Sequence, residues 1–338
     1  MTVTSSTTKA TTARKRERVL PPAVTGQEYI LIAVIALLWI VLALATPGFM
    51  DPYSIQSLLW RLAPVGIMAI GMTIIMVTAG IDISIAAILM VCSVTLGKLI
   101  AELGWNFWIA LAASMALGAL LGAVNGLLIS YGRVPAIIIT FGTANLFQFL
   151  GLKIFNSKTV NGLPNSRNIL GPGEEGRFLG LPIAFIIMVV LVALAWFYLR
   201  HWPGGRHFYA IGDDENAAGL AGVNVRWRVF IAYVLMGVLV GLAAGITIAG
   251  GTSTLDQSVG KGQELMTIAA TVIGGTSVVG GRGSVLGAVL GALLVQTVAT
   301  GVTQLGWPSQ LSNLFVGVFI IIAVGADLIR ERRRKALL

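Results

Sequence analysis

The chain has 338 residues, of which 56% are hydrophobic and only 11% charged, and its formal net charge is +9 at pH 7. Ordinary soluble domains carry about 25% charged residues, so this composition predicts a protein that faces lipid over most of its surface. The basic residues gather at the two ends of the chain and are not interleaved with aromatic residues, which argues against nucleic-acid binding.

The two ends of the chain differ in composition from the rest. Residues 1–27 are rich in Ser, Thr and basic residues, so we expect a disordered cytoplasmic tail there. Residues 331–338 form a second basic tail, and residues 28–330 form a single transmembrane domain. The run from Tyr29 to Ala45 ends in a motif that resembles a signal-peptidase site. We interpret it as an uncleaved first span, because it is long enough to cross a membrane.

Long apolar runs recur along the whole domain. Since a membrane span needs roughly 20 apolar residues, the sequence predicts about ten spans. The predicted fold class is therefore an all-α, polytopic membrane protein. The eighth run is short and ends in glycines, which indicates a broken or re-entrant helix. The ten predicted spans are 29–46, 62–79, 83–101, 105–131, 134–155, 178–200, 229–250, 264–279, 284–304 and 311–329.

The distribution of basic residues predicts the orientation of these spans. With the N-terminus inside, the inner segments hold most of the 23 Lys and Arg residues, including those of both tails. Cytoplasmic loops retain positive charge, so we expect both termini in the cytoplasm and an even number of spans. The protein is then a multi-pass component of the cell (inner) membrane.

Glycines recur at every fourth residue in three of the predicted spans. This spacing lets helix backbones approach closely, and such packing holds helices together in lipid. We expect a compact helical bundle. The three triplets are Gly118, Gly122 and Gly126; Gly237, Gly241 and Gly245; and Gly283, Gly287 and Gly291.

Motifs for enzymatic, metal or nucleotide chemistry are missing from the sequence. The chain has one cysteine, Cys92, and no HExxH, GxSxG or Cys/His cluster, so we expect neither an enzyme nor a metal site. The glycine-rich stretch from Gly274 to Gly287 lacks the Lys-Ser/Thr pair of a phosphate-binding loop, and we interpret it as a helix break on the inner side. We therefore expect no cofactor, and any ATP-driven work has to come from a partner.

Asp82 is the one carboxylate close to apolar runs on both sides. It lies in the sequence Gly80-Ile-Asp-Ile-Ser84, immediately before the third span. One interpretation makes it a helix cap that accepts backbone N–H groups of the first turn. The other makes it a contact for an ion or solute, because a buried acid in a membrane protein is a functional hypothesis by default.

Neutral polar side chains also lie within the predicted spans. A row of amides and hydroxyls suits a hydrated path for an uncharged polar solute. The alternative is hydrogen bonding between helices, which is as common a use of such residues. The candidates for the path are Asn125, Thr140, Asn145, Gln148, Gln296, Thr297 and Thr300.

The segment from residue 201 to residue 228 is polar, and both histidines, His201 and His207, lie in it. It is predicted to be a cytoplasmic loop with one short helix. Asp213 is predicted as the N-cap, Asp214 and Glu215 place negative charge in the first turn, and Gly222 ends the helix.

This short helix presents a small apolar face with a charged rim, which is typical of a helix that binds in a groove of another protein. The alternative, a helix resting on the lipid surface, favours larger apolar residues and basic ones. We expect this segment to dock onto a partner through Arg206, Asp213, Asp214, Glu215, Ala217, Leu220 and Ala221.

Four separated motifs, in order, resemble the ribose-type permeases of ABC importers. They are GIDIS at 80–84, VPAIIITFGT at 134–143, GRHFYAIGDDENAAGLAGV at 205–223 and IAATVIGGTSVVGGRGSVLG at 268–287. The resemblance extends from about residue 60 to the C-terminus. The chain departs from the commonest pattern at Ala86 and Ala87, where many relatives carry glycine.

The resemblance implies a permease of about ten helices that pairs with a second permease chain and with cytoplasmic ATPase subunits. The family's segment that matches Gly205 to Val223 contacts the ATPase. An extracytoplasmic binding protein would deliver the solute, with pentoses, hexoses, polyols and autoinducer-2 among the family's substrates. Two other functions stay open at this point: a secondary transporter or channel that uses Asp82, and an ABC permease for branched-chain amino acids.

Overall fold

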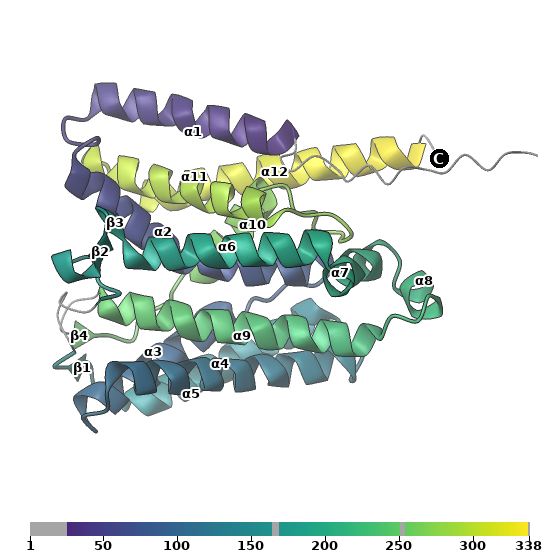
Figure 1. Cartoon of the computed structure of the whole chain (residues 1–338), viewed down its shortest axis with the longest axis horizontal. Coiled ribbons are helices and arrows are strands. Elements are labelled where there is room, and N and C mark those ends of the chain that lie inside the picture. Colours follow the sequence, from purple (N-terminus) through teal and green to yellow (C-terminus); the bar gives the residue numbers. More distant parts are fainter. Residues whose placement is uncertain (1–25, 164–168, 251–253, 337–338) are drawn as a thin grey trace, which may run out of the picture.

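A computed structural model of the protein describes residues 26–163, 169–250 and 254–336. In these residues, ten apolar helices form a single bundle (Figure 1). Seven of them are long and apolar enough to cross a membrane, and three are shorter. The long ones are α1 (Gly26–Ala45), α2 (Pro52–Val77), α4 (Phe107–Ser130), α5 (Ala136–Phe155), α6 (Ile183–His201), α9 (Val225–Ala249) and α11 (Val285–Gln304). The shorter ones are α3 (Ile85–Ala101), α10 (Gln263–Ile273) and the apolar part of α12 (Gln310–Ala336).

These helices confirm the predicted all-α architecture of a polytopic membrane protein. Each of the ten predicted spans corresponds to one helix. α2 begins at Pro52 rather than at residue 62. The predicted span began too late because the first turns of α2 carry Gln56, Ser57 and Arg61, which a search for apolar runs leaves out. The predicted 1–27 tail lies outside the described residues apart from its last two positions, and α12 continues as a helix to Ala336.

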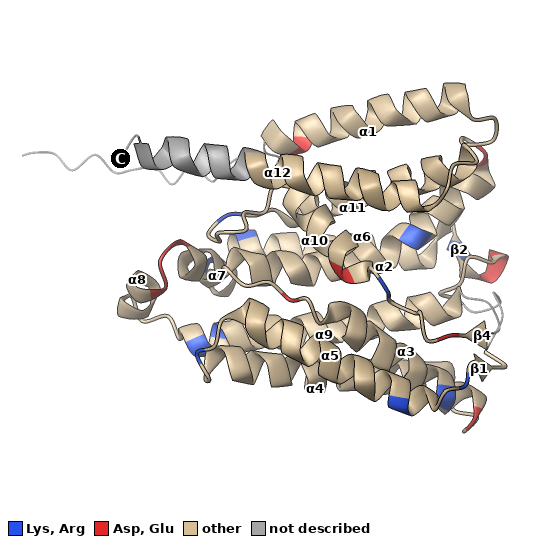
Figure 2. Ribbon diagram, turned by 180° about the vertical axis from the view of Figure 1, so that it is seen from behind, with Lys and Arg blue, Asp and Glu red and all other residues tan. Residues whose placement is uncertain are grey.

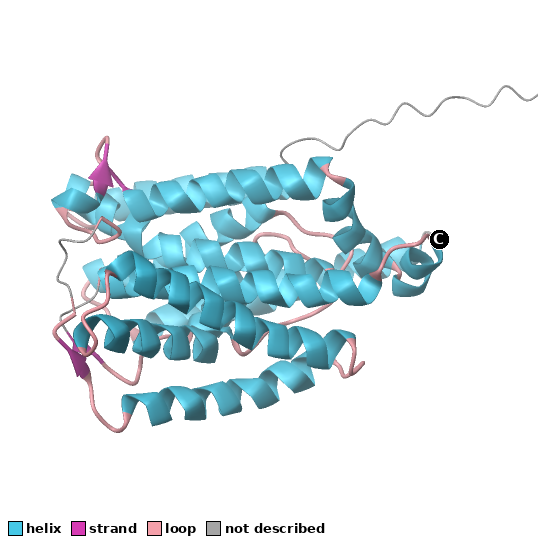
Figure 3. Cartoon of the chain, turned by 60° about the horizontal axis from the view of Figure 1, so that its bottom comes forward, coloured by secondary structure: helices cyan, strands magenta, loops and turns pink. Residues whose placement is uncertain are grey.

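In the described part of the chain, two small antiparallel strand pairs that the sequence does not predict lie at the same end of the bundle, on opposite sides of it (Figure 3). β1 (Val160–Asn161) pairs with β4 (Thr254–Leu255). β2 (Arg177–Phe178), which follows the short 3-10 helix η1 (Glu174–Gly176), pairs with β3 (Leu181–Pro182). Each strand has only two residues, too few to give an alternating pattern.

The opposite end of the bundle carries two short helices, α7 (Pro203–Asp213) and α8 (Glu215–Leu220). The C-terminal end of α12 also lies at this α8 end, whereas the link between α1 and α2 lies at the strand end (Figure 1). α1 therefore begins at the α8 end as well. Lys, Arg, Asp and Glu lie mostly towards the two ends of the bundle, and its middle is largely uncharged (Figure 2).

The glycine triplets of α4 and α9 face each other, as close packing of helices requires. A Cβ at Gly118 would lie 2.1 Å from the carbonyl oxygen of Gly237, and one at Gly237 would lie 1.9 Å from that of Gly118. A Cβ at Gly122 would meet the Tyr233 carbonyl oxygen at 2.2 Å. The two backbones therefore touch directly, which confirms the expectation of a compact bundle.

The third glycine triplet packs α11 against α10. A Cβ at Gly287 would lie 2.0 Å from the Gly274 carbonyl oxygen, and one at Gly291 would lie 2.0 Å from that of Ala270. α10 has 11 residues, so it is about 16 Å long, half of a hydrocarbon core of about 30 Å. The predicted break in the eighth span is confirmed, and the helix ends at Ile273 rather than at residue 279.

Candidate functional site

The segment between α6 and α9 forms two helices where one was predicted. Pro203 occupies the first turn of α7, where its missing N–H costs nothing. Gly205 lets α7 turn back onto α6, since a Cβ there would lie 2.3 Å from the Tyr198 carbonyl oxygen. α7 buries Phe208 and Ile211 against the bundle. The Pro-Gly-Gly start of α7 reads as a loop in sequence, and α7 was missed for this reason.

The N-cap of α8 is Asp214, and the prediction of Asp213 is wrong. The Asp214 carboxylate accepts a hydrogen bond from the Ala217 N–H at 2.9 Å. Asp213 is the last residue of α7, and Asp214 is the single residue between α7 and α8. Glu215 lies in the first turn as predicted, and Gly222 follows the helix with a φ of +85°.

The two sides of α8 differ in exposure. Ala218 is buried against the rest of the protein, whereas Ala217, Leu220 and Ala221 are exposed, with Leu220 at 92% of its full exposure. Arg206, Asp213, Asp214 and Glu215 are exposed as well. All seven residues predicted to dock onto a partner are therefore exposed. Two of them, Glu215 and Leu220, also border an open hollow of about 1060 Å³ between α8, α9, the α4–α5 turn and residues 78–80.

α7 meets the C-terminal end of α2 at the level of the backbone. A Cβ at Gly212 would lie 1.8 Å from the carbonyl oxygen of Val77 and 2.5 Å from the nitrogen of Gly281. The Gly281 N–H donates to that same Val77 oxygen at 2.9 Å. The Tyr209 hydroxyl donates to the Gly283 carbonyl oxygen at 3.1 Å, and burial raises the pKa of Tyr209 to about 12. We call this contact of α7, the end of α2 and the 280–283 turn the glycine junction.

The non-helical backbone that follows α2 carries the buried Asp82. Its Oδ1 accepts hydrogen bonds from the N–H and the hydroxyl of Ser84, at 2.8 and 2.6 Å. Ser84 is the N-cap residue of α3, so Asp82 organises the turn before the helix and does not bind the N–H groups of its first turn. Asp82 Oδ2 has no hydrogen-bond partner within the described residues.

Two of the predicted path residues hold this turn in place. The Asn125 amide donates to the Ser84 hydroxyl at 2.7 Å, and the Thr140 hydroxyl donates to the Ile81 carbonyl oxygen at 3.2 Å. Both side chains are fully buried. For these two residues, the geometry matches the alternative interpretation, hydrogen bonding between helices.

The other predicted path residues border two separate hollows. Asn145 and Gln148 line a hollow of about 530 Å³ between α3, α5 and the start of α10, which we call the α5 hollow. Gln296 and Thr300 line one of about 350 Å³ between α2 and α11, the α11 hollow. Thr297 accepts a hydrogen bond from the Trp39 indole at 3.1 Å and so ties α11 to α1. The other polar residues of these hollows, including Arg61, Gln257, Lys261 and Glu264, were not predicted from the sequence.

Comparison with known proteins identifies the family to which this chain belongs. Residues 54–324 match the family model described as branched-chain amino acid transport system / permease component. The chain belongs to this permease family. It is therefore a multi-pass protein of the cell membrane and a component of a transport system. No solved structure gives a significant match.

Curated relatives narrow the type of permease. The chain is 36% identical over 298 residues to the ribose import permease of Escherichia coli strain K12, which covers 88% of this chain and 92% of that protein. It is 32% identical to the fructose import permease of Rhizobium meliloti, over 87% and 85% of the two chains. It is 34% identical to the autoinducer 2 import permease of Photorhabdus laumondii, over 76% of each. The predicted membership of the sugar and autoinducer-2 ABC permeases is confirmed.

Proposed function

We propose that this chain is the membrane-spanning subunit of an ABC importer that moves a small neutral sugar or sugar-like solute into the cytoplasm. Separate cytoplasmic ATPase subunits supply the energy, and an extracytoplasmic binding protein supplies the solute. A second permease chain, identical or related, completes the path. Pentoses, hexoses, polyols and autoinducer-2 are the candidate solutes, and the names of the relatives support this range.

The observation that carries the proposal is the glycine junction between α7 and the end of α2. α8 offers an exposed face of Ala217, Leu220 and Ala221 to the ATPase. α7 continues directly into α8, and Gly212 lies against the Val77 carbonyl with no side chain between the two backbones. A movement of α8 and α7 would therefore reach α2 and the turn around Asp82 directly, because no flexible side chain separates the two backbones at Gly212 and Val77.

The neutral character of the solute is supported by the two hollows. Their borders carry amides and hydroxyls, with Asn145 and Gln148 in one and Gln296 and Thr300 in the other. The charged residues Lys261 and Glu264 of the α5 hollow have opposite signs, and Arg61 is the charged residue of the α11 hollow. Such groups donate and accept hydrogen bonds without demanding a charged ligand. The ion pair of Lys98 with Glu102 lies within α3 and its C-cap and not on either border.

The family description leaves branched-chain amino acids as the second candidate solute class. The test is reconstitution of the permease with its ATPase and binding protein in vesicles, followed by uptake of a panel of sugars, polyols and L-leucine. The proposal expects ATP-dependent uptake of a sugar or polyol and none of leucine. Uptake of leucine without uptake of any sugar or polyol would identify branched-chain amino acids as the solute class. Uptake that continues without the ATPase would contradict the proposal.

A further inference from the structure

The α5 hollow lies at the level where two short helices begin. Phe141, Asn145 and Gln148 occupy the middle turns of α5 and border the hollow. On the other side are the first turn of α3 and the loop that leads into α10. This loop is packed tightly onto α3, because a Cβ at Gly260 would lie 2.8 Å from the Ala86 carbonyl oxygen. Transporter sites are commonly built at such helix starts near the middle of the membrane.

The polar groups of the α5 hollow have hydrogen-bonding capacity to spare. The side chains of Gln148 and Gln257 make no hydrogen bond within the described part of the chain. Asn145 uses its amide N–H on the Phe141 carbonyl oxygen, at 2.8 Å, which leaves its own carbonyl oxygen for a ligand. Glu264 holds a buried carboxylate oxygen that has no partner among the described residues. A buried acceptor without a partner is costly unless a ligand or water satisfies it.

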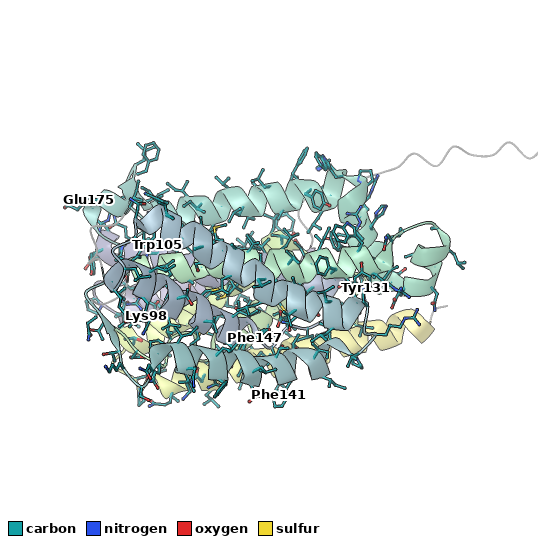
Figure 4. The ribbon with its side chains drawn as sticks, turned by 90° about the horizontal axis from the view of Figure 1, so that it is seen from below. Lys98, Trp105, Tyr131, Phe141, Phe147 and Glu175 are labelled. Atoms are coloured by element: carbon teal, nitrogen blue, oxygen red, sulfur yellow. The ribbon has the colours of Figure 1, made fainter. Side chains whose placement is uncertain are left out.

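The remaining border of the α5 hollow is apolar and uncrowded. On α3, Ala86 and Ala87 leave room where larger side chains would fill the space, and the buried Met90 also borders the hollow. Phe141 is 62% exposed and lies at the rim, whereas Phe147 on the same helix is 4% exposed (Figure 4). An apolar wall with a few convergent polar groups, in a volume of about 530 Å³, is typical of a site for a small molecule.

From this arrangement, we infer that the α5 hollow binds the transported solute, and that the solute is a neutral ring of monosaccharide size with several hydroxyls. The Glu264 carboxylate and the amide oxygens accept hydrogen bonds from the hydroxyls. The amide N–H groups of Gln148 and Gln257 and the Lys261 ammonium donate to them, and the C–H face of the ring lies on Phe141. The inference rests on the proposed function and adds the place where the solute is recognised.

The first test uses the single native cysteine, Cys92, which is fully buried and so reacts slowly with polar thiol reagents. Gln148→Cys places a reactive thiol in the hollow of the complete, ATP-driven transporter. A high concentration of D-ribose, D-fructose or ribitol is expected to slow its methanethiosulfonate labelling severalfold. Gln310→Cys, a matched control at an exposed position that borders neither hollow, is expected to show no such protection. Protection by L-leucine instead, protection at both positions, or no protection by any sugar would overturn the inference.

The second test separates this inference from the proposed function. Glu264→Gln keeps the shape of the side chain but halves its accepting capacity, so we expect slower uptake and an altered preference among the sugars. Gln310→Ala, at an exposed position that borders neither hollow, should leave both unchanged. If the wild-type protein transports no sugar, the proposed function fails. If it transports sugar and Glu264→Gln and Gln148→Ala behave like Gln310→Ala, only the assignment of the α5 hollow fails.

Discussion

Gly212 lies directly against the carbonyl oxygen of Val77, at a distance that no Cβ tolerates. Gly212 belongs to α7 and Val77 is the last residue of α2, so this contact joins the surface helices to the centre of the bundle. The next residues along the chain form the turn that holds Asp82 and begins α3. The contact is therefore where a movement of α7 and α8 reaches the membrane helices.

Gly212→Ala tests this contact. The added methyl group would lie 1.8 Å from the Val77 oxygen, so α7 must move away from α2. We expect ATP-dependent uptake to fall more than tenfold and stability to fall by about 1–3 kcal/mol, the usual cost of overpacking. Gly219→Ala is the matched control, because nothing lies within 4 Å of a Cβ at that position of α8. Full uptake by Gly212→Ala would show that α7 does not act through this contact.

Leu220→Asp tests docking by the exposed face of α8. Leu220 is 92% exposed, so the substitution should leave thermal unfolding in detergent unchanged. We expect it to abolish uptake and to release the ATPase during co-purification, because a charge then enters an apolar contact. Leu179→Asp is the control, since Leu179 is 88% exposed at the strand end. Normal co-purification of the ATPase with Leu220→Asp would argue against docking at this face.

Asp214→Ala tests the corrected position of the N-cap. Loss of the hydrogen bond from the Ala217 N–H should destabilise α8 by about 1 kcal/mol. Hydrogen exchange of the Ala217 amide should therefore become faster by roughly fivefold, which is what about 1 kcal/mol gives. Asp213→Ala, one residue earlier, should leave this rate unchanged. Equal effects of the two substitutions would contradict the cap.

Gly237→Ala tests the contact between α4 and α9. A methyl group at this position would lie 1.9 Å from the Gly118 carbonyl oxygen, so the two helices have to separate. We expect the melting temperature in detergent to fall clearly, with lower yield in membranes. Gly142→Ala on α5 is the control, because it has open space around it. Equal melting temperatures for the two variants would show that the glycines of α4 and α9 are not needed for packing.

The sequence predicts well those features that follow from a residue pattern within one element. Glycine at every fourth residue predicts close helix contacts, and Gly118 and Gly237 do face each other. The positive φ of Gly222 is likewise expected from its place after a short helix. Boundaries were less predictable where two elements join without a loop. Aspartate caps helices well, so Asp213 and Asp214 are equal candidates in the sequence. Asp214 is the cap because Asp213 still belongs to α7.

The site itself is less visible in the sequence because it is assembled from distant segments. Asn145 and Gln148 stand out as polar residues within an apolar run. Lys261 and Glu264 lie more than 100 residues later, next to a loop whose path into the α5 hollow has no periodic signal. Asn125 looks like a path residue in sequence, yet its partner is Ser84, 41 residues away. Which polar residues meet is a matter of tertiary packing.

The most direct test of the account is crosslinking from position 220 in membranes that contain the whole transporter. Because Cys92 is buried, Leu220→Cys provides the accessible thiol for a short bifunctional reagent. The account predicts one adduct with the ATPase subunit, while Leu179→Cys at the strand end gives none. A transporter that takes up its solute normally while the thiol at 220 forms no adduct, and stays open to bulky polar reagents, would contradict it.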